Sequence, residues 1–189
     1  MNRKSFVCVC AILFIAMGSA NLFPIGGFSV SIMGNYYKPA DQGFKNFYGE
    51  NHYYPECRLN LKLVNGLYLW SSYGFLSAEG TTIPQLNEKT EWKQSFLSFG
   101  GGYKAALSGR LSSFFRLGGL YTKYKEEALE TTIDDSAFGF VVSAGLIFDI
   151  TGTFFTELEL GYLSVSDTID NASIKLGGFK GGIGIGIKF

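Results

Sequence analysis

The amino-acid sequence predicts an all-β fold, an eight-stranded antiparallel up-and-down barrel. Three observations predict it: eight windows in which apolar and polar residues alternate, connections that are alternately short and long, and a composition rich in glycine and aromatic residues. The chain has 189 residues, of which 25 are Gly, 18 Phe and 11 Tyr, and 47% are hydrophobic. This length suits one domain, and the composition is too apolar for a disordered chain.

The first twenty residues have the organisation of a secretory signal peptide. Arg3 and Lys4 are followed by an uncharged run over residues 5–17, and then by Gly18, Ser19 and Ala20. The apolar run is too short to span a hydrocarbon core of about 30 Å as a helix. We therefore expect residues 1–20 to be cleaved after Ala20, leaving residues 21–189 as the barrel domain.

The predicted strands follow in order, each recognised by a period of two residues. Residues 53–64 show it best: Cys57, Leu59 and Leu61 lie on one face, and Arg58 and Asn60 on the other. The eight windows are residues 28–35, 53–64, 67–77, 92–103, 113–125, 138–149, 154–162 and 179–189. The third, fourth and fifth windows have the composition of strands, but Phe, Tyr and Gly occur on both faces.

The connections between these windows alternate in length. Short turns are predicted at residues 65–66, 105–110 and 151–153, and Asn65-Gly66 is the dipeptide typical of a type I′ hairpin turn. Longer polar segments are predicted at residues 37–52, 78–91, 126–135 and 167–172. Short turns on one rim and long loops on the other indicate a closed up-and-down barrel.

Alternation alone fits two barrels, a soluble one with an apolar interior and a membrane-spanning one with a polar interior. Three features favour the transmembrane β-barrel. The polar faces carry glycines and charges of both signs, as a narrow interior requires. Aromatic residues lie near strand ends, as in a membrane-interface girdle; they are Tyr68, Trp92, Tyr103, Tyr121, Tyr124 and Tyr162. The last strand ends on Phe189, without a polar tail.

The last strand also carries a resemblance to a known family. Gly184, Ile187 and Phe189 match the carboxyl-terminal assembly signal of bacterial outer-membrane barrels, whereas Gly182 stands where a polar residue is usual. Residues 65–75, with residues 44–49 upstream, are similar to small proteins of the outer-membrane β-barrel domain family, related in architecture to the OmpA-like and OmpX-like barrels. The resemblance implies residence in the outer membrane of a bacterial cell envelope, with lipid, lipopolysaccharide and the barrel-assembly machinery as partners. It implies no catalytic residues.

Composition argues against several functions. The 16 basic and 16 acidic residues give no net charge, so no nucleic-acid partner is expected. His52 is the only histidine, and Cys57 is the only cysteine after the leader, so no metal site and no cofactor are expected. The predicted loop acids Asp134, Asp135, Asp167 and Asp170 lack the spacing of a calcium loop, and solvated carboxylates are the favoured interpretation.

The polar faces predict a network of charges inside the barrel. Arg58, Arg116, Glu157 and Glu159 lie at similar depth if these faces point inward, and two arginines can satisfy two glutamates through bidentate hydrogen bonds. Glu56, Lys62 and Lys180 share the same faces. Glycines at 182, 184 and 186, with Ser98, Gly100 and Ser143, are expected to leave room for the long side chains.

The sequence therefore predicts a monomeric, non-enzymatic outer-membrane protein with a structural or surface-interaction role. Two alternatives stay open. An OmpW-like barrel passes small hydrophobic molecules through a lateral opening, and Phe96 and Leu176 suit an apolar pocket on the lumen side. A lipid A-modifying barrel enzyme would use His52 at the outer rim, although no serine or acid is singled out as its partner.

Overall fold

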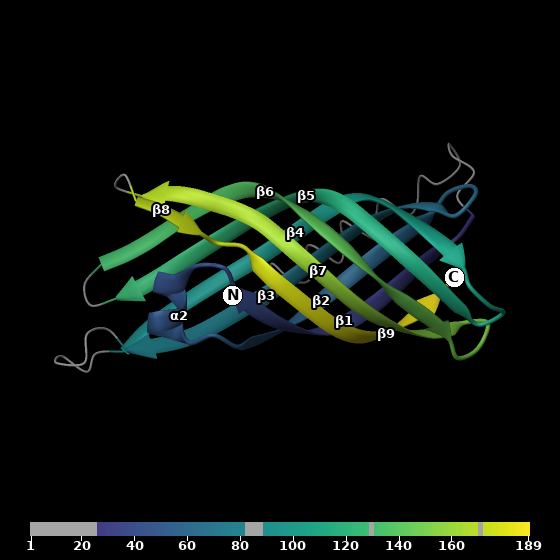
Figure 1. Ribbon diagram of the computed structural model, residues 1–189, viewed down its shortest axis with the longest axis horizontal. Coiled ribbons are helices and arrows are strands. Elements are labelled where there is room, and N and C mark those ends of the chain that lie inside the picture. Colours follow the sequence, from purple (N-terminus) through teal and green to yellow (C-terminus); the bar gives the residue numbers. More distant parts are fainter. Residues whose placement is uncertain (1–25, 82–88, 129–130, 170–171) are drawn as a thin grey trace.

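The computed structural model describes residues 26–81, 89–128, 131–169 and 172–189, and it shows a closed antiparallel barrel. Figure 1 shows the barrel with its axis close to horizontal. The strands are β1 (Phe28–Pro39), β2 (His52–Lys62), β3 (Leu67–Thr81), β4 (Lys89–Ala106), β5 (Leu111–Ala128), β6 (Thr131–Asp149), β7 (Phe154–Ile169), β8 (Ala172–Lys175) and β9 (Gly178–Lys188). The predicted signal peptide, residues 1–20, lies outside the described residues.

From β1 to β8, each strand pairs with the next one in the sequence, and β1 pairs with β9 to close the cylinder. The short β8 and the longer β9 pair with different parts of β7, so together they count as one of the eight strands of the barrel wall. Each of these eight wall strands is called a stave below. The structure therefore confirms the predicted eight-stranded up-and-down barrel. Closure leaves no free sheet edge along the part of the cylinder where all eight staves are paired.

The two faces of each strand carry opposite kinds of side chain, as the alternation predicts. Large apolar side chains point outward and are exposed; Ile185 on β9, for example, is 70% exposed and Phe138 on β6 is 77% exposed. Charged side chains such as Arg58 and Glu157 point inward and are 1% exposed. This is the reverse of the distribution in a soluble protein. Among the described residues, no helix is long and apolar enough to cross a membrane.

The short turns lie at the end of the barrel that also holds the carboxyl terminus (Figure 1). Asn65 and Gly66 have φ angles of 54° and 82°, the left-handed values that a type I′ turn requires. The remaining two short connections are residues 107–110 and 150–153. All three predicted short turns are thus where the sequence placed them.

The opposite end differs from the prediction. Residues 126–128 and 131–135, predicted as part of a long loop, belong to β5 and β6, which pair from Ala128 and Thr131 downward. Strands β3, β4 and β7 are also longer than their predicted windows. On these extensions the outward positions carry polar residues, such as Glu79 and Glu127, because water surrounds them, whereas Leu163 and Val165 on the inward face are buried. Without an outward apolar face, these segments resemble loops in composition.

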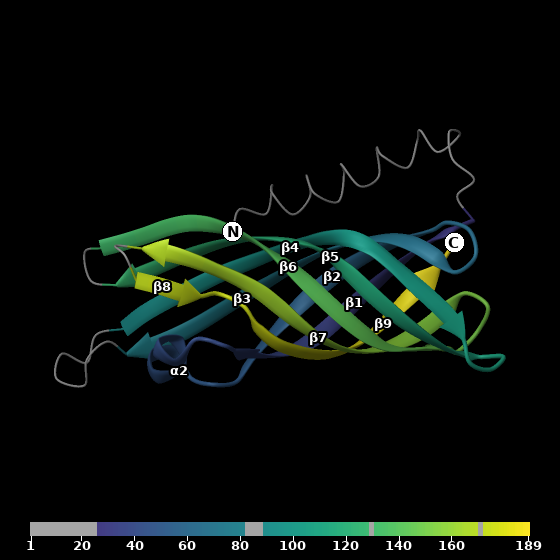
Figure 2. The same ribbon diagram turned by 45° about the horizontal axis from the view of Figure 1, so that its top comes forward.

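The connection between β1 and β2 contains a helix, α2 (Gln42–Tyr48), that the sequence did not predict. The Asp41 side chain caps it by accepting a hydrogen bond from the Phe44 backbone N–H at 2.9 Å. Gly49, with a φ of 95°, ends it. The helix lies at the same end of the barrel as β8 (Figures 1 and 2).

The outer part of the barrel is divided into two pieces. β6 pairs with β7 only from Gly139 and Val165 toward the short-turn end, and β2 pairs with β3 only from Glu56 and Gly74. Beyond these points, the extensions of β3 to β6 form one sheet, and β2, β1, β9 and β7 stay paired in the other, which continues into the β7–β8 hairpin. Pro55 lies where β2 separates from β3. Because proline has no backbone N–H, the unpaired edge has one hydrogen-bond donor fewer that needs a partner.

The Asn65-Gly66 turn gives a test of the barrel's register. A Cβ atom at Gly66 would lie 2.5 Å from the backbone oxygen of Lys104, at a φ angle that L residues rarely adopt. We expect Gly66→Ala to lower the free energy of unfolding by about 1 kcal/mol or more. Urea unfolding in lipid vesicles measures this.

Gly101→Ala is the matched control, because a Cβ atom there meets nothing within 4 Å. Its effect should stay within about 0.5 kcal/mol. Equal effects of the two substitutions would contradict the turn geometry.

Candidate functional site in the barrel lumen

The four residues predicted to form a charge network meet in the middle of the lumen. Arg58 reaches from β2 to β7, where its guanidinium contacts the Glu157 carboxylate and lies 2.8 Å from Glu159 Oε2. Arg116 reaches from β5 to the same two carboxylates, at 2.6 Å from Glu157 and 2.5 Å from Glu159. The network therefore joins strands that are not neighbours in the sheet.

Two further charges, outside the predicted four, complete the layer. Glu56 lies 2.5 Å from Arg58 and 3.0 Å from Lys180, and Lys180 lies 2.8 Å from Glu159. Three acids and three bases are thus enclosed with no net charge. Both added residues share the inward faces of β2 and β9 with predicted lumen positions, so the period-two pattern contained the signal for them.

Neutral polar groups extend this layer along the lumen. The Asn35 amide lies 3.5 Å from Glu56, and Arg116 donates to the Asn60 side chain at 3.4 Å. The Arg116 guanidinium also lies over the Phe114 ring, 4.0 Å from its centroid. Each ion therefore has several partners, which is the condition under which buried charges are tolerated.

The glycines of β9 make room in a different way from the one predicted. A Cβ atom at Gly186 would lie 2.3 Å from the Phe155 ring, and one at Gly184 would lie 2.2 Å from the Met33 sulfur. At Gly182 it would lie 2.3 Å from the Asn35 side chain. These glycines leave room for Phe155 on β7 and for Met33 and Asn35 on β1. Lys180, on the same face, is the residue of this strand that joins the charge layer.

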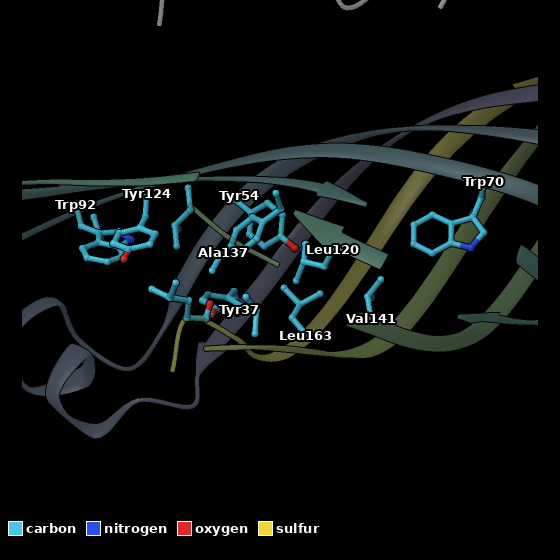
Figure 3. Packing of buried hydrophobic residues seen from close by; sticks show 14 of the residues in the cluster. Tyr37, Tyr54, Trp70, Trp92, Leu120, Tyr124, Ala137, Val141 and Leu163 are labelled. Atoms are coloured by element: carbon cyan, nitrogen blue, oxygen red, sulfur yellow. The ribbon is translucent and has the colours of Figure 1, made fainter. Parts of the chain in front are cut away.

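The outer half of the lumen is filled by aromatic and aliphatic side chains (Figure 3). Tyr37 and Tyr54 both pack on Phe96, with ring centroids 5.7 and 5.3 Å apart. Phe96 and Leu176, predicted on the lumen side, are each 3% exposed. The Leu176 carbonyl accepts hydrogen bonds from the Tyr37 hydroxyl at 2.9 Å and from the Gln94 amide at 3.0 Å, which holds this residue inside.

Helix α2 covers the outer mouth of the lumen. Its Phe44 ring meets Trp92 at 5.2 Å and 85°, and Trp92 in turn stacks on Tyr124 at 5.3 Å. The Tyr48 hydroxyl donates to Glu126 at 2.5 Å, and desolvation, assisted by this hydrogen bond, raises the Tyr48 pKa. The helix is therefore held to β4 and β5, which are distant from it in the sequence.

The structure does not bring the described members of the remaining candidates together. The His52 ring lies 3.0 Å from the Gly49 carbonyl oxygen and packs against Phe44, and among the described residues it makes no hydrogen bond to a serine or a carboxylate. Asp134 and Asp135 lie on β6, and Asp167 on β7 accepts from the Tyr124 hydroxyl at 2.8 Å. Asp170 lies outside the described residues. Within the described ranges, no group of three His, Cys, Asp or Glu side chains could hold a metal ion.

Of the three residues of the resemblance to an assembly signal, Gly184 and Ile187 lie on opposite faces of β9, and Phe189 directly follows its last residue. Gly184 points into the lumen, and Ile187 and Phe189 point outward. Phe189 stacks on Phe28 with ring centroids 4.6 Å apart, and the two residues exchange backbone hydrogen bonds of 2.8 and 3.2 Å. These contacts join the two staves at which the barrel closes.

The architecture is that of the small eight-stranded outer-membrane barrels. The chain is similar to the structures of Neisserial surface protein A (TM-score 0.66, 12% identity, 86% of this chain and 97% of that chain) and of OprG from Pseudomonas aeruginosa (0.65, 12%, 88% and 98%). It is also similar to the N-terminal barrel domain of Pseudomonas aeruginosa OprF (0.60, 16%, 87% and 98%). At these low identities, the structural similarity shows a shared fold alone. No protein-family model matches the chain, and no curated protein matches it in sequence.

Removing one member of the charge layer tests whether its partners are buried together. Arg116→Ala leaves Glu157 and Glu159 with one base fewer, and Glu159→Ala leaves Lys180 and Arg58 with one acid fewer. We expect each to cost about 3–5 kcal/mol of stability. Urea unfolding in lipid vesicles measures the loss.

Asp134→Ala supplies the control. Asp134 pairs with Lys123 at 3.1 Å, and both side chains are about half exposed. Its loss should cost less than about 1 kcal/mol. If both lumen variants cost no more than this control, the lumen charges do not form a buried network.

Proposed function

We propose that this protein is a non-enzymatic integral protein of the bacterial outer membrane, with a structural or surface-interaction role. The observation that carries the proposal is the band of exposed apolar side chains around the whole barrel. Every stave contributes to it: Leu59 on β2 is partly exposed, and exposed examples on the others are Ile32, Leu69, Phe99, Leu117, Phe140, Leu158 and Ile183. A band of this extent would not be stable in water but is what hydrocarbon requires.

Aromatic residues support the same placement. On β7, Phe154 and Tyr162 lie at the two ends of the outward apolar run, with Leu158 midway between them. On β5 and β6, Tyr121 and Phe138 pack together at 4.8 Å where the run ends. Aromatic residues at both limits of an apolar band are typical of membrane interfaces.

The filled lumen supports an anchoring role over that of an open pore. The charge layer crosses the interior, the aromatic cluster occupies the outer half, and α2 covers the mouth. The strands continue beyond the apolar band only at the end opposite the short turns, so the polar extensions of β3 to β6 would face the cell exterior. A surface role suits them, and Neisserial surface protein A, which has a similar fold, is named for such a location.

Export, assembly and oligomeric state belong to the same proposal. Residues 1–20 would direct the chain across the inner membrane, and the barrel-assembly machinery would recognise β9 through Gly184, Ile187 and Phe189. The barrel would stand as a monomer in outer-membrane lipid and lipopolysaccharide. The outward position of Ile187 and Phe189, beside the closing strand β1, supports this role for β9.

A charge at the centre of the band separates a membrane barrel from a soluble one. Leu158→Arg should cost about 2–4 kcal/mol when the protein unfolds from lipid vesicles, because the side chain would lie near the bilayer midplane. Thr168→Arg, on the exposed outer end of the same strand, should cost about 0–1 kcal/mol.

Equal costs of the two substitutions would contradict a membrane-embedded band. In cells, the unsubstituted protein should enter the outer-membrane fraction and change its gel mobility on heating. Recovery in the periplasmic supernatant, without a folded band in mild detergent, would refute the proposed location.

A second candidate function, passage of small hydrophobic molecules, is favoured by one observation. The pairing of β6 with β7 ends at Gly139 and Val165, beside the apolar cluster of the outer lumen. An apolar molecule could leave this cluster there, between β6 and β7, without breaking hydrogen bonds between the two strands. Val165 and Ala137, both buried, would line such a path.

The two tryptophans test this candidate, because Trp92 lies in the outer lumen and Trp70 lies apart from it toward the short turns (Figure 3). In a Trp70→Phe variant, an apolar quencher entering the outer lumen should quench Trp92 fluorescence with a saturable concentration dependence. In a Trp92→Phe variant, the remaining Trp70 should show no saturation. Linear quenching in both variants would leave passage without support and favour the anchoring role.

A further inference from the structure

Three lysines lie on the inward faces of their strands at the short-turn end of the barrel. They are Lys62 on β2, Lys104 on β4 and Lys188 on β9, and each lies two to four residues beyond the level of the charge layer. With a rise of about 3.4 Å per residue and a strand tilt of about 40°, this places them about 5–10 Å from that layer, at the mouth of the lumen. We call Lys62, Lys104 and Lys188 the inner lysine group.

The inner lysine group has only one acidic partner. Lys188 forms an ion pair with Asp149 on β6. Lys104 is half-buried and lies within electrostatic reach of Lys188, Asp149 and Lys62, so side chains from three strands converge on it. Among the described residues, neither Lys62 nor Lys104 forms an ion pair. The group therefore holds three positive charges against one negative charge.

The surroundings of this mouth do not restore the balance. Residues 26–31, 61–68, 103–114, 147–155 and 185–189 form this end of the described chain, and within them Asp149 is the only acidic side chain, whereas Arg110 is a further base. The charge layer deeper in the lumen is neutral by itself. At the opposite end, bases are paired with acids, as in Lys93 with Glu91. A narrow opening lined by charge of one sign attracts counter-ions strongly.

Two buried donors beside Lys104 have no hydrogen-bond partner among the described residues. Tyr68 lies between Lys62 and Gly102 in the sheet and is 7% exposed, and its hydroxyl group is unpaired. Arg116 Nε, on the residue paired with Gly102, is also unpaired. A Cβ atom at Gly102 would lie 2.6 Å from the Tyr68 hydroxyl oxygen, so this hydroxyl lies over the inward position next to Lys104. Unpaired buried donors require an acceptor such as water or an anion.

We propose that the inner lysine group binds the phosphate group of a water-soluble ligand. Lys62 and Lys104 would donate charge-assisted hydrogen bonds to the phosphate oxygens, and the Tyr68 hydroxyl would donate another. The surplus of two positive charges over Asp149 matches the charge of a phosphate dianion. Because the three lysines lie on inward faces, the ligand enters from the water at the short-turn end and not from the bilayer.

The test follows phosphate binding to the folded protein in detergent micelles, through the NMR signals of the backbone amides of Lys62 and Lys104. Inorganic phosphate replaces chloride at constant ionic strength, above about pH 7, where phosphate is mainly a dianion. The signals of the unsubstituted protein should shift and saturate with phosphate concentration. Lys62→Gln combined with Lys104→Gln should weaken binding at least about 10-fold, because two charge-assisted hydrogen bonds are lost.

Two further variants complete the test. Lys45→Gln combined with Lys175→Gln removes the same charge from the opposite end of the barrel and should bind phosphate within about 2-fold of the unsubstituted protein, because distant charges are screened. Tyr68→Phe removes only the hydroxyl group and should weaken binding about 3-fold or more. Its change of gel mobility on heating should be retained, so Tyr68→Phe tests the site even if the double lysine variant does not fold.

Several results would overturn the proposal. Shifts that grow linearly with phosphate would indicate a general salt effect without a site. Equal affinity of the double lysine variant and its control would show that Lys62 and Lys104 hold no ligand. Phosphatidylglycerol added to the micelles should not displace the phosphate, and displacement would show that the lysines bind a lipid headgroup instead of a soluble ligand.

The outcome is separable from that of the proposed function. Phosphate binding needs only the folded barrel, so a negative result refutes this site and leaves the outer-membrane location intact. Recovery of the protein in the periplasmic supernatant would refute the location, and phosphate binding could still be measured on the folded chain.

Discussion

The narrowness of an eight-stranded cylinder is the constraint on which the rest of this structure depends. Such a barrel is just wide enough for side chains to fill, so residues from opposite walls must meet. Arg58 and Arg116 do meet Glu157 and Glu159 across the lumen, and Lys180 and Glu56 extend the layer. A charge on one strand therefore limits which residues can lie opposite it, on strands across the lumen. These strands are not paired with each other in the sheet.

The same narrowness explains the unequal sizes of the inward residues. Where Phe155, Met33 and Asn35 enter the lumen, the facing positions on β9 are Gly186, Gly184 and Gly182. Tyr54 on β2 likewise lies against Gly74 on β3, and Tyr68 on β3 lies against Gly102 on β4. Large and small residues thus alternate across neighbouring strands. The high glycine content of the chain reflects this packing as well as its turns.

Much of this arrangement could be predicted from the sequence because a membrane barrel needs strict alternation wherever it faces lipid. The strands β2, β6, β7 and β9, their inward faces and the short turns follow from that period. Lipid imposes no such pattern beyond the band, so the extensions of β3 to β7 resemble loops in composition. The four network residues could be grouped by depth along their strands, and the structure adds Glu56 and Lys180 from the same faces.

Helix α2, in contrast, could not be predicted from the sequence. It has no buried residue of its own and no apolar period, and it is positioned by the Asp41 cap, by Phe44 against Trp92 and by Tyr48 against Glu126. These partners are up to 78 residues distant in the sequence. No local pattern encodes contacts of this range, so both the helix and the covering of the outer mouth become visible only in three dimensions.

The divided outer end of the barrel provides a measure of membrane position that does not use side chains. Hydrocarbon contains no water to satisfy free backbone groups, so a strand edge cannot be left unpaired within it. The pairing of β6 with β7 ends at Gly139, next to Phe138, and the pairing of β3 with β2 ends at Gly74, next to Tyr73. The backbone pairing thus ends beside the last outward apolar residue of β6, and within two residues of the last one of β3, which is Phe75. Amide hydrogens on the free edge of β6 beyond Gly139 should therefore exchange with deuterated solvent in intact vesicles, while those below it stay protected, which would draw the bilayer boundary directly on the chain.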